Sequence, residues 1–302
     1  MKCSRIMAIK RIKSWIACFA GLSLLLGSVF PSMAQNKNVL PSWAEGKTKS
    51  AIVNFVTGSN ILGQPGFIPP EQRIAFFDFD GTLWAEDPIA RLIFSIEQMK
   101  LLLPEHPEWK DNRFVSIAMK ADIRAIEQQW DSTFSTLDSL ITREIGAEEY
   151  AARVVSFLAE ARHPKFRRLF RETTYLPMRE LLTFLADNGF TAYIVSASGA
   201  GFIRAFSQEA FGITPDRVIA DPSAVKHGPV ISCANARHSG DLDLLMRGRD
   251  PSPRSLQILI NHDDISREYF YGDRDGKAAA AAAKYGWTVV SMRRDWKQIF
   301  SL

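Results

Sequence analysis

The sequence has few cysteines and no apolar run long enough to cross a membrane. These two features argue against a disulfide-stabilised protein and against a membrane-spanning one. Only three of the 302 residues are cysteines, and two of them, Cys3 and Cys18, lie near the start. The remaining one, Cys233, cannot form an internal disulfide, so an oxidising compartment is tolerated but not exploited. The apolar run over residues 15–30 has about 16 residues, fewer than the roughly 20 that a membrane-spanning helix needs.

Several motifs of common enzyme and binding classes are also missing. The sequence shows no zinc-ligand spacing, no P-loop, no Ser-His-Asp constellation, no haem site and no internal repeat. Hydrophobic residues make up 46% and charged residues 23%, which is ordinary for a globular enzyme. The length suits one large α/β domain with an insertion, or two small domains.

The first 34 residues differ from the rest and predict a secretory signal peptide. Five basic residues and no acidic residue precede the apolar run, and Ser32-Met33-Ala34 follows it. This order of basic region, apolar region and small-x-small site indicates cleavage after Ala34 in preference to an uncleaved membrane anchor. We therefore expect residues 1–34 to be removed, and the mature protein to be periplasmic or secreted without membrane attachment.

Loss of this leader also removes the excess of positive charge. The whole chain has 37 Lys and Arg against 33 Asp and Glu, a formal net charge of +4. Without the five basic residues of the leader, 32 remain, and the net charge is near −1. The mature chain therefore has no basic excess of the kind that favours nucleic-acid binding, and we expect none.

Strand and helix patterns alternate along most of the mature chain. The N-terminal segment over 35–86 contains an apolar run of strand length, residues 73–78, and a helical region over 87–172 follows this segment. Residues 173–302 then alternate between the two patterns, with strand candidates at 191–196, 217–220, 229–234, 256–261 and 287–291. This alternation predicts an α/β fold with a parallel sheet covered on both faces. Ligands of such folds bind beyond the carboxyl ends of the strands.

The first candidate motif lies at such a strand end, in Asp78-Phe-Asp80-Gly81-Thr82-Leu83. Two carboxylates on one turn repel each other and favour a divalent cation between them. A phosphate ester needs the same cation, because its own charge repels an anionic nucleophile. Asp78 can then attack phosphorus, while Asp80 acts as general acid and base. Thr82 can hold Asp80 by a hydrogen bond or bind the phosphoryl group.

These residues resemble a known family. F-D-F-D-G-T-L-W, residues 77–84, resembles the first motif of haloacid dehalogenase-like phosphatases. The mature chain is most similar to exported phosphoserine-phosphatase-like hydrolases, and more weakly to acid phosphatases, at Leu40-Pro-Ser-Trp43, His106-Pro-Glu-Trp109, Ile194-Val-Ser196 and Trp287-Thr-Val-Val-Ser-Met. The resemblance implies a Rossmann-like three-layer core, an inserted helical cap domain, Mg²⁺ and a phosphomonoester substrate. Within the family, the acid at Asp80 argues against a dehalogenase.

The second and third motifs of that family have candidate positions. Ser196 ends an apolar strand, so its hydroxyl and the backbone N–H of Ala197 can donate to a phosphoryl oxygen. Ser198 is the alternative to Ser196. The resemblance also implies a lysine that neutralises the transferring phosphoryl group, and Lys226, between two strand candidates, is the available residue.

The fourth motif, which should supply a further metal ligand, has two competing positions. Asn235 and Asp241 follow an apolar strand and resemble the G-N-S-D-G-D form of the related hydrolases, with wider spacing. Asp273 and Asp275 resemble the usual G-D-x-x-x-D string, but Lys277 stands where its second acid belongs. The apolar strand before Asn235 favours the first position, and we keep the second as the alternative.

Together these patterns predict a Mg²⁺-dependent phosphomonoester hydrolase that works through an aspartyl-phosphate. The Mg²⁺ ligands would be Asp78, the Asp80 carbonyl and Asp241, with Asn235 beside them. Two alternatives stay open: an exported binding protein on a degenerate hydrolase scaffold, which the irregular third and fourth motifs suggest, and a phosphotransferase. The physiological substrate and the oligomeric state are not readable from these residues.

Overall fold

The computed structural model describes residues 39–87, 89–197, 199–221, 225, 231–235, 237, 239–248, 254–271, 273 and 276–302. The predicted signal peptide, residues 1–34, lies outside this part of the chain. Among the described residues, no helix combines the length and the apolar character needed to span a bilayer.

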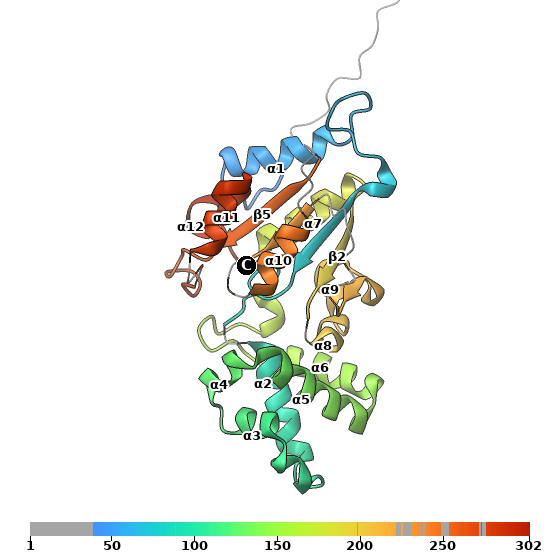
Figure 1. Cartoon of the computed structure of the whole chain (residues 1–302), viewed down its shortest axis with the longest axis vertical. Coiled ribbons are helices and arrows are strands. Elements are labelled where there is room, and N and C mark those ends of the chain that lie inside the picture. The colour runs from blue at the N-terminus through green and yellow to red at the C-terminus, as the bar shows by residue number, and fades with distance from the viewer. Residues whose placement is uncertain are drawn as a thin grey trace, which may run out of the picture. The chain divides into compact units, whose positions relative to one another are not determined.

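In the described part of the chain, six parallel strands form one sheet in the order β3-β2-β1-β4-β5-β6. This confirms the predicted α/β fold (Figure 1). The chain proceeds outward from β1 through β2 to β3, and then outward on the other side from β4 to β6. The order therefore reverses between β1 and β4, which is where α/β sheets open a ligand crevice. The strands are β1 (Ile74–Asp78), β2 (Thr191–Val195), β3 (Val218–Ile219), β4 (Ile231–Ala234), β5 (Leu256–Asn261) and β6 (Thr288–Ser291).

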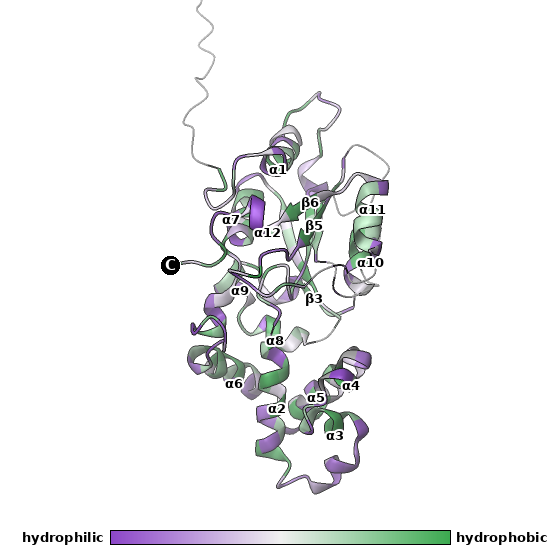
Figure 2. Cartoon of the chain, turned by 90° about the vertical axis from the view of Figure 1, so that its left-hand side faces the viewer, coloured by the Kyte–Doolittle hydropathy of each residue, from purple (hydrophilic) through white to green (hydrophobic). Residues whose placement is uncertain are grey.

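Helices cover both faces of the sheet, because alternate strand residues point to opposite sides. On β1, Ala75 and Phe77 belong to the hydrophobic cluster that contains buried residues of α1 (Lys47–Gly58) and α7 (Leu176–Asp187). Phe76, between them, joins the cluster formed with α10 and α11. Figure 2 shows these two pairs of helices on opposite sides of the strands. The core is therefore the three-layer, Rossmann-like arrangement that the sequence predicts. Helix α10 spans Ser239–Arg247 and α11 spans Lys277–Tyr285.

A helical insert separates β1 from α7, and we use this name for the helices α2 to α6 (Figure 1, green). They are α2 (Ala90–Leu102), α3 (Arg113–Met119), α4 (Ile123–Gln128), α5 (Trp130–Ile145) and α6 (Ala147–Glu160). Helices α2, α3, α5 and α6 contact one another, and their buried residues belong to the same hydrophobic cluster as one face of the sheet. The remaining short elements are η1 (Pro70–Gln72), η2 (Pro107–Asp111), η3 (Phe170–Thr173), α8 (Ala200–Arg204), α9 (Ser207–Phe211), η4 (Pro215–Arg217) and α12 (Met292–Asp295).

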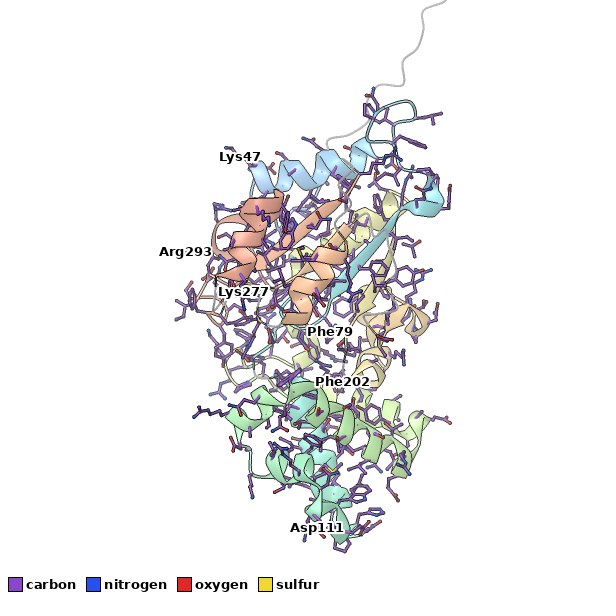
Figure 3. All side chains as sticks on the ribbon, viewed as in Figure 1. Lys47, Phe79, Asp111, Phe202, Lys277 and Arg293 are labelled. Atoms are coloured by element: carbon purple, nitrogen blue, oxygen red, sulfur yellow. The ribbon has the colours of Figure 1, made fainter. Side chains whose placement is uncertain are left out.

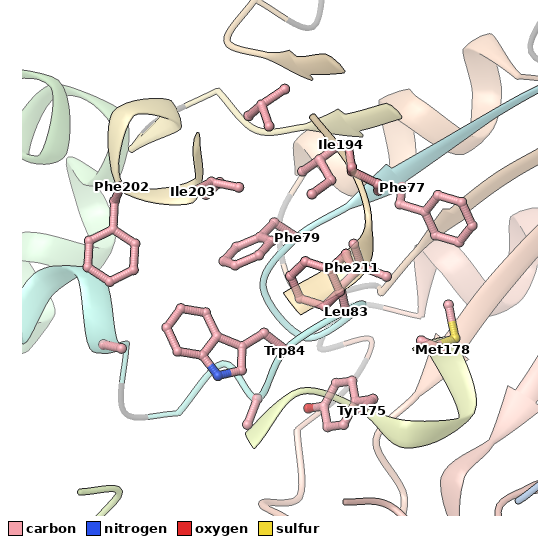
Figure 4. Close-up of a cluster of buried hydrophobic side chains, with 14 of the residues drawn as sticks. Phe77, Phe79, Leu83, Trp84, Tyr175, Met178, Ile194, Phe202, Ile203 and Phe211 are labelled. Atoms are coloured by element: carbon pink, nitrogen blue, oxygen red, sulfur yellow. The ribbon is translucent and has the colours of Figure 1, made fainter. Parts of the chain in front are cut away.

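Aromatic packing anchors the chain where it leaves the sheet for the insert. Trp84 is only 1% exposed, and its ring lies 5.3 Å from Phe79 and 6.0 Å from Phe202, measured between ring centroids. Its indole N–H donates to the carbonyl of Phe170 at 2.8 Å. Phe79 and Phe202 lie near the junction of sheet and insert (Figure 3), and Figure 4 shows the buried cluster around Trp84. Trp84 is therefore a packing residue that fixes the loop after β1.

Candidate active site

Asp78 is the last residue of β1, the strand beside the point where the strand order reverses. It is partly buried and pairs in register with Val195, the residue before Ser196. The Thr82 hydroxyl donates to Asp78 Oδ2 at 3.0 Å. The expected hydrogen bond of this hydroxyl, with Asp80, is therefore replaced by one with Asp78. Because the turn after the strand brings Thr82 back under Asp78, its hydroxyl orients the nucleophile candidate.

The surroundings of Asp78 disfavour an isolated negative charge. Burial is the main cause, and together with the charge of Asp80 it raises the pKa of Asp78 to about 7. The charge of Glu86 adds to this effect, while the hydrogen bond from Thr82 opposes it. A carboxyl group in this position gains from a nearby cation, because the cation favours its ionised form.

Asp80 points its side chain and its backbone carbonyl toward different partners. The carboxylate forms an ion pair with the guanidinium of Arg91, a residue of α2 in the helical insert. The carbonyl accepts a hydrogen bond from Asn235 Nδ2 at 2.5 Å. Arg91 does not stand out in the sequence, because an arginine in a helical pattern is usually a solvent-facing residue.

Asn235 follows β4 directly and lies across the reversal point from Asp78. Its side chain is 1% exposed, and Nδ2 lies 3.4 Å from Asp78 Oδ2 as well as 2.5 Å from the Asp80 carbonyl. Its Oδ1 accepts a hydrogen bond from the backbone N–H of Arg237 at 2.7 Å. The structure therefore brings together three of the groups that the sequence placed at the metal site.

The carbonyl of Gly81 is fixed by a buried histidine. His262 Nε2 lies 2.7 Å from the Gly81 carbonyl, and Nδ1 lies 3.0 Å from Glu268 Oε2. His262 and Glu268 are 1% and 0% exposed. Because a carbonyl only accepts, Nε2 must carry a hydrogen; the Nδ1 contact then needs a second proton, on the ring or on the carboxyl. His262 thus ties the end of β5 to the loop after β1.

Gly81 also needs to be a glycine. Its φ is +67°, and a Cβ atom would lie 2.5 Å from Asn235 Nδ2, 2.8 Å from Glu86 Oε2 and 2.9 Å from the Tyr271 hydroxyl. The side chains of Asn235, Glu86 and Tyr271 therefore close around the backbone between Asp80 and Thr82. The Tyr271 ring stacks on His262, with ring centroids 4.0 Å apart.

Arg237 connects the segment after β4 to the start of the insert. Its guanidinium lies 3.3 Å from Glu86 Oε1 and 2.6 Å from Asp87 Oδ2, and its Cζ lies 4.9 Å from the centroid of the Tyr271 ring. Glu86 is 1% exposed, so this cation compensates a buried carboxylate. Arg237 was not selected from the sequence, where it is one residue of a polar loop.

Of the residues predicted for the second and third motifs, only Ser196 and Ala197 lie in the described part of the chain. Ser196 is buried at the end of β2, where its backbone N–H donates to the Ile219 carbonyl at 3.0 Å, and Ala197 beside it is exposed. The strand pairing of β1 and β2 therefore brings Ser196 to the same sheet edge as Asp78. Lys226 and the alternative Ser198 lie outside the described residues.

The two candidate positions of the fourth motif differ. Asp241 is 7% exposed in the first turn of α10, the helix after β4. Asp273 is half-buried, and its Oδ2 accepts a hydrogen bond from the Ala279 backbone N–H in α11 at 2.6 Å, whereas Asp275 lies outside the described residues. Among the described residues, no group of three or more His, Cys, Asp or Glu side chains gathers as a metal site. Asp78, Asp80 and Asp241 thus do not form such a group.

Comparison with known proteins agrees with this geometry. No curated protein matches the chain. A sequence model of the haloacid dehalogenase-like hydrolases matches residues 75–276, which is more than half of the chain. The matched region begins in β1, just before Asp78, and reaches the start of α11. With its parallel sheet and an acid pair at the end of the central strand, the chain belongs to the haloacid dehalogenase-like hydrolase family.

Proposed function

We propose that this hydrolase is a Mg²⁺-dependent phosphomonoesterase that works through an aspartyl-phosphate on Asp78. The observation that carries the proposal is the meeting of polar groups between the ends of β1 and β4. There the amide of Asn235 lies within 3.4 Å of Asp78 Oδ2 and 2.5 Å of the Asp80 carbonyl. Carboxylate, carbonyl and amide oxygens are the ligands that Mg²⁺ prefers in proteins.

The donor set and its charge fit a divalent cation. Asp78 and the Asp80 carbonyl would hold it, together with the Asn235 oxygen. Asp241 in the first turn of α10 would be a further ligand only by moving toward them, because it does not gather with Asp78 and Asp80 in this structure. Asn235 must turn its amide for this role, because its nitrogen faces the Asp80 carbonyl. The raised pKa of Asp78 supports the proposal, since burial and the charge of Asp80 disfavour its ionised form and a nearby cation would favour it. Bound Mg²⁺ would supply the charge that offsets repulsion between Asp78 and a phosphate dianion.

The protein's own groups then divide the chemistry between them. An Asp78 oxygen attacks phosphorus, the bond from phosphorus to the ester oxygen breaks, and Asp80 gives its proton to the departing alcohol. Asp80 next takes a proton from a water molecule, which attacks phosphorus and frees Asp78 as inorganic phosphate forms. Thr82 orients the nucleophile, and Ser196, the Ala197 N–H and Lys226 would bind the phosphoryl oxygens.

We also propose that the protein acts after export. The basic and apolar order of residues 1–34 supports a cleaved leader and a periplasmic or secreted enzyme. Its partner would be a small phosphomonoester, because the near-neutral mature chain offers no general attraction to nucleic acid.

Hydrolysis of p-nitrophenyl phosphate by the protein lacking residues 1–34 tests this function. We expect release of p-nitrophenol with Mg²⁺, loss of release with EDTA, and recovery when Mg²⁺ is added in excess. Failure to release phosphate from any of a panel of phosphoesters would instead support the exported binding protein. Transfer of the phosphoryl group to a sugar acceptor, with no free phosphate, would support the phosphotransferase.

A further inference from the structure

The helical insert places one buried cation against the acid and base candidate of the core. Arg91 is the second residue of α2, and its guanidinium forms an ion pair with Asp80 Oδ2. The side chains of Arg91 and Asp80 are only 4% and 15% exposed. An arginine buried to this degree is uncommon on a helix and indicates a specific charge partner.

The same guanidinium touches the loop that follows β2. A Cβ atom on Gly199 would overlap Arg91 Nη1 and would lie 2.9 Å from Arg91 Cδ. Gly199 comes three residues after Ser196, in the segment proposed to bind the phosphoryl group. Arg91 therefore lies between two segments that would surround the substrate, the loop of Asp80 and the loop of Ser196.

Residues of α5 hold Arg91 in this position from behind. Its Cζ lies 5.2 Å from the centroid of the Phe134 ring. The charge of Asp138 also acts on Arg91, and Asp138 is itself fixed by hydrogen bonds from Tyr150 at 2.9 Å and Ser95 at 3.3 Å. The guanidinium of Arg91 is thus contacted by Phe134 and influenced by Asp138 on the insert side, and it pairs with Asp80 on the core side.

We propose that Arg91 is a substrate-binding residue whose guanidinium exchanges Asp80 for an anionic oxygen group of the substrate. This inference rests on the proposed phosphatase function. Paired with Arg91, the Asp80 carboxylate is engaged with the insert and does not meet a leaving alcohol. Transfer of the guanidinium to the substrate would release this carboxylate toward the leaving group. Arg91 would therefore couple substrate binding to the position of Asp80.

The anionic group is either the transferring phosphoryl or a second anion on the leaving alcohol. A guanidinium binds both phosphate and carboxylate in the same forked geometry, with two parallel N–H donors. Two substrates separate these sources: p-nitrophenyl phosphate, which carries only the phosphoryl charge, and phosphoserine, which adds a carboxylate.

Kinetics of Arg91→Gln and Arg91→Lys test the proposal with the mature protein. For Arg91→Gln we expect KM to rise about 10- to 100-fold, the loss of one charge-assisted contact. The kcat at saturating substrate should change far less, and Arg91→Lys should recover part of the affinity. A rise in KM with both substrates assigns Arg91 to the phosphoryl group. A rise in KM with phosphoserine alone assigns it to the second anion.

Arg153→Gln is the matched control, because Arg153 lies in α6 of the same insert but is half-buried and contacts Glu149 and Gln98 instead of Asp80. Its KM should equal that of the wild type. If the KM values of both Arg91 variants stay at the wild-type value on both substrates, the inference is wrong while the phosphatase function stands. A wild-type protein with no turnover on any phosphoester would refute the proposed function itself. Arg91→Lys keeps the charge in the buried position, so it covers the case in which Arg91→Gln does not fold.

Discussion

The two sides of the candidate site are built differently. On the core side, side chains from the ends of β4 and β5 grip the backbone of the loop after β1: Asn235 bonds the Asp80 carbonyl, and His262 contacts the Gly81 carbonyl. On the insert side, the contact is an ion pair between two side chains, Arg91 and Asp80. Backbone contacts fix the position of the reacting groups, whereas a side-chain ion pair can exchange partners.

This difference separates the parts of the site that serve folding from those that serve binding. The contacts of the core side are buried, so breaking one leaves an unsatisfied polar group at a cost of about 1–3 kcal/mol. Arg91, in contrast, can meet a substrate anion in place of Asp80 without leaving its charge unpaired. Substitutions of the core-side residues that hold the loop after β1 should therefore lower the free energy of unfolding together with the activity. Substitution of the reacting carboxyl group of Asp78 should lower the activity alone.

The largest expected effect comes from Asp78→Asn, which removes the nucleophile and keeps the shape of the side chain. We expect turnover of p-nitrophenyl phosphate to fall by about 10⁴-fold or more, as when other covalent nucleophiles are removed. The melting temperature should not fall, because burial and the charge of Asp80 already disfavour the ionised carboxyl. Phosphate release and thermal unfolding measure the two effects. Turnover near the wild-type rate would contradict the aspartyl-phosphate mechanism.

The sequence was sufficient to predict the fold and the acid pair for a physical reason. Apolar strands alternating with helices admit few arrangements other than a parallel sheet, and such a sheet brings its strand ends together. Asp78 and Asn235 each follow an apolar run directly, so their meeting across the reversal point follows from the strand order. Local patterns along the chain place each residue at a strand end, whereas their meeting also depends on the strand order that the structure shows.

The supporting residues could not be predicted in the same way. Arg91 stands in a helical segment and Arg237 in a polar one. His262 directly follows the apolar run 256–261, but its partner, the Gly81 carbonyl, is brought near it only by tertiary packing. The Thr82 hydroxyl, which we expected to bond with Asp80, is directed to Asp78 by the turn. Such details depend on backbone turns and tertiary contacts, which residue types at fixed spacings do not determine.

Gly81→Ala probes the tight packing of the core side. A Cβ atom there would lie 2.5 Å from Asn235 Nδ2, and the alanine backbone would have to adopt a φ of +67°. Backbone strain and overlap together should lower the free energy of unfolding by about 2–4 kcal/mol. Gly212→Ala is the control, because Gly212 has a φ of +69° but no atom within 4 Å of the added Cβ.

Denaturant unfolding of both variants separates strain from overlap. Gly212→Ala should lose about 1 kcal/mol from backbone strain alone, and its activity should match the wild type. Equal losses for the two alanine variants would show that the contacts around Gly81 add nothing, and would remove the basis for a rigid core side.

The smallest expected effect distinguishes the two candidate positions of the fourth motif. Asn235→Ala removes the side chain that meets Asp78 and the Asp80 carbonyl. We expect the Mg²⁺ concentration for half-maximal activity to rise about 10- to 100-fold, the usual effect of removing a group at or beside a metal site. Asp273→Asn should leave this concentration unchanged, because Asp273 accepts a hydrogen bond from the Ala279 N–H of α11. A shift in Mg²⁺ dependence for Asp273→Asn but not for Asn235→Ala would transfer the metal site to the end of β5. In that case Asn235, at the end of β4, would hold the loop after β1 but would not bind the metal. The core side would then position the reacting groups without contributing a metal ligand from β4.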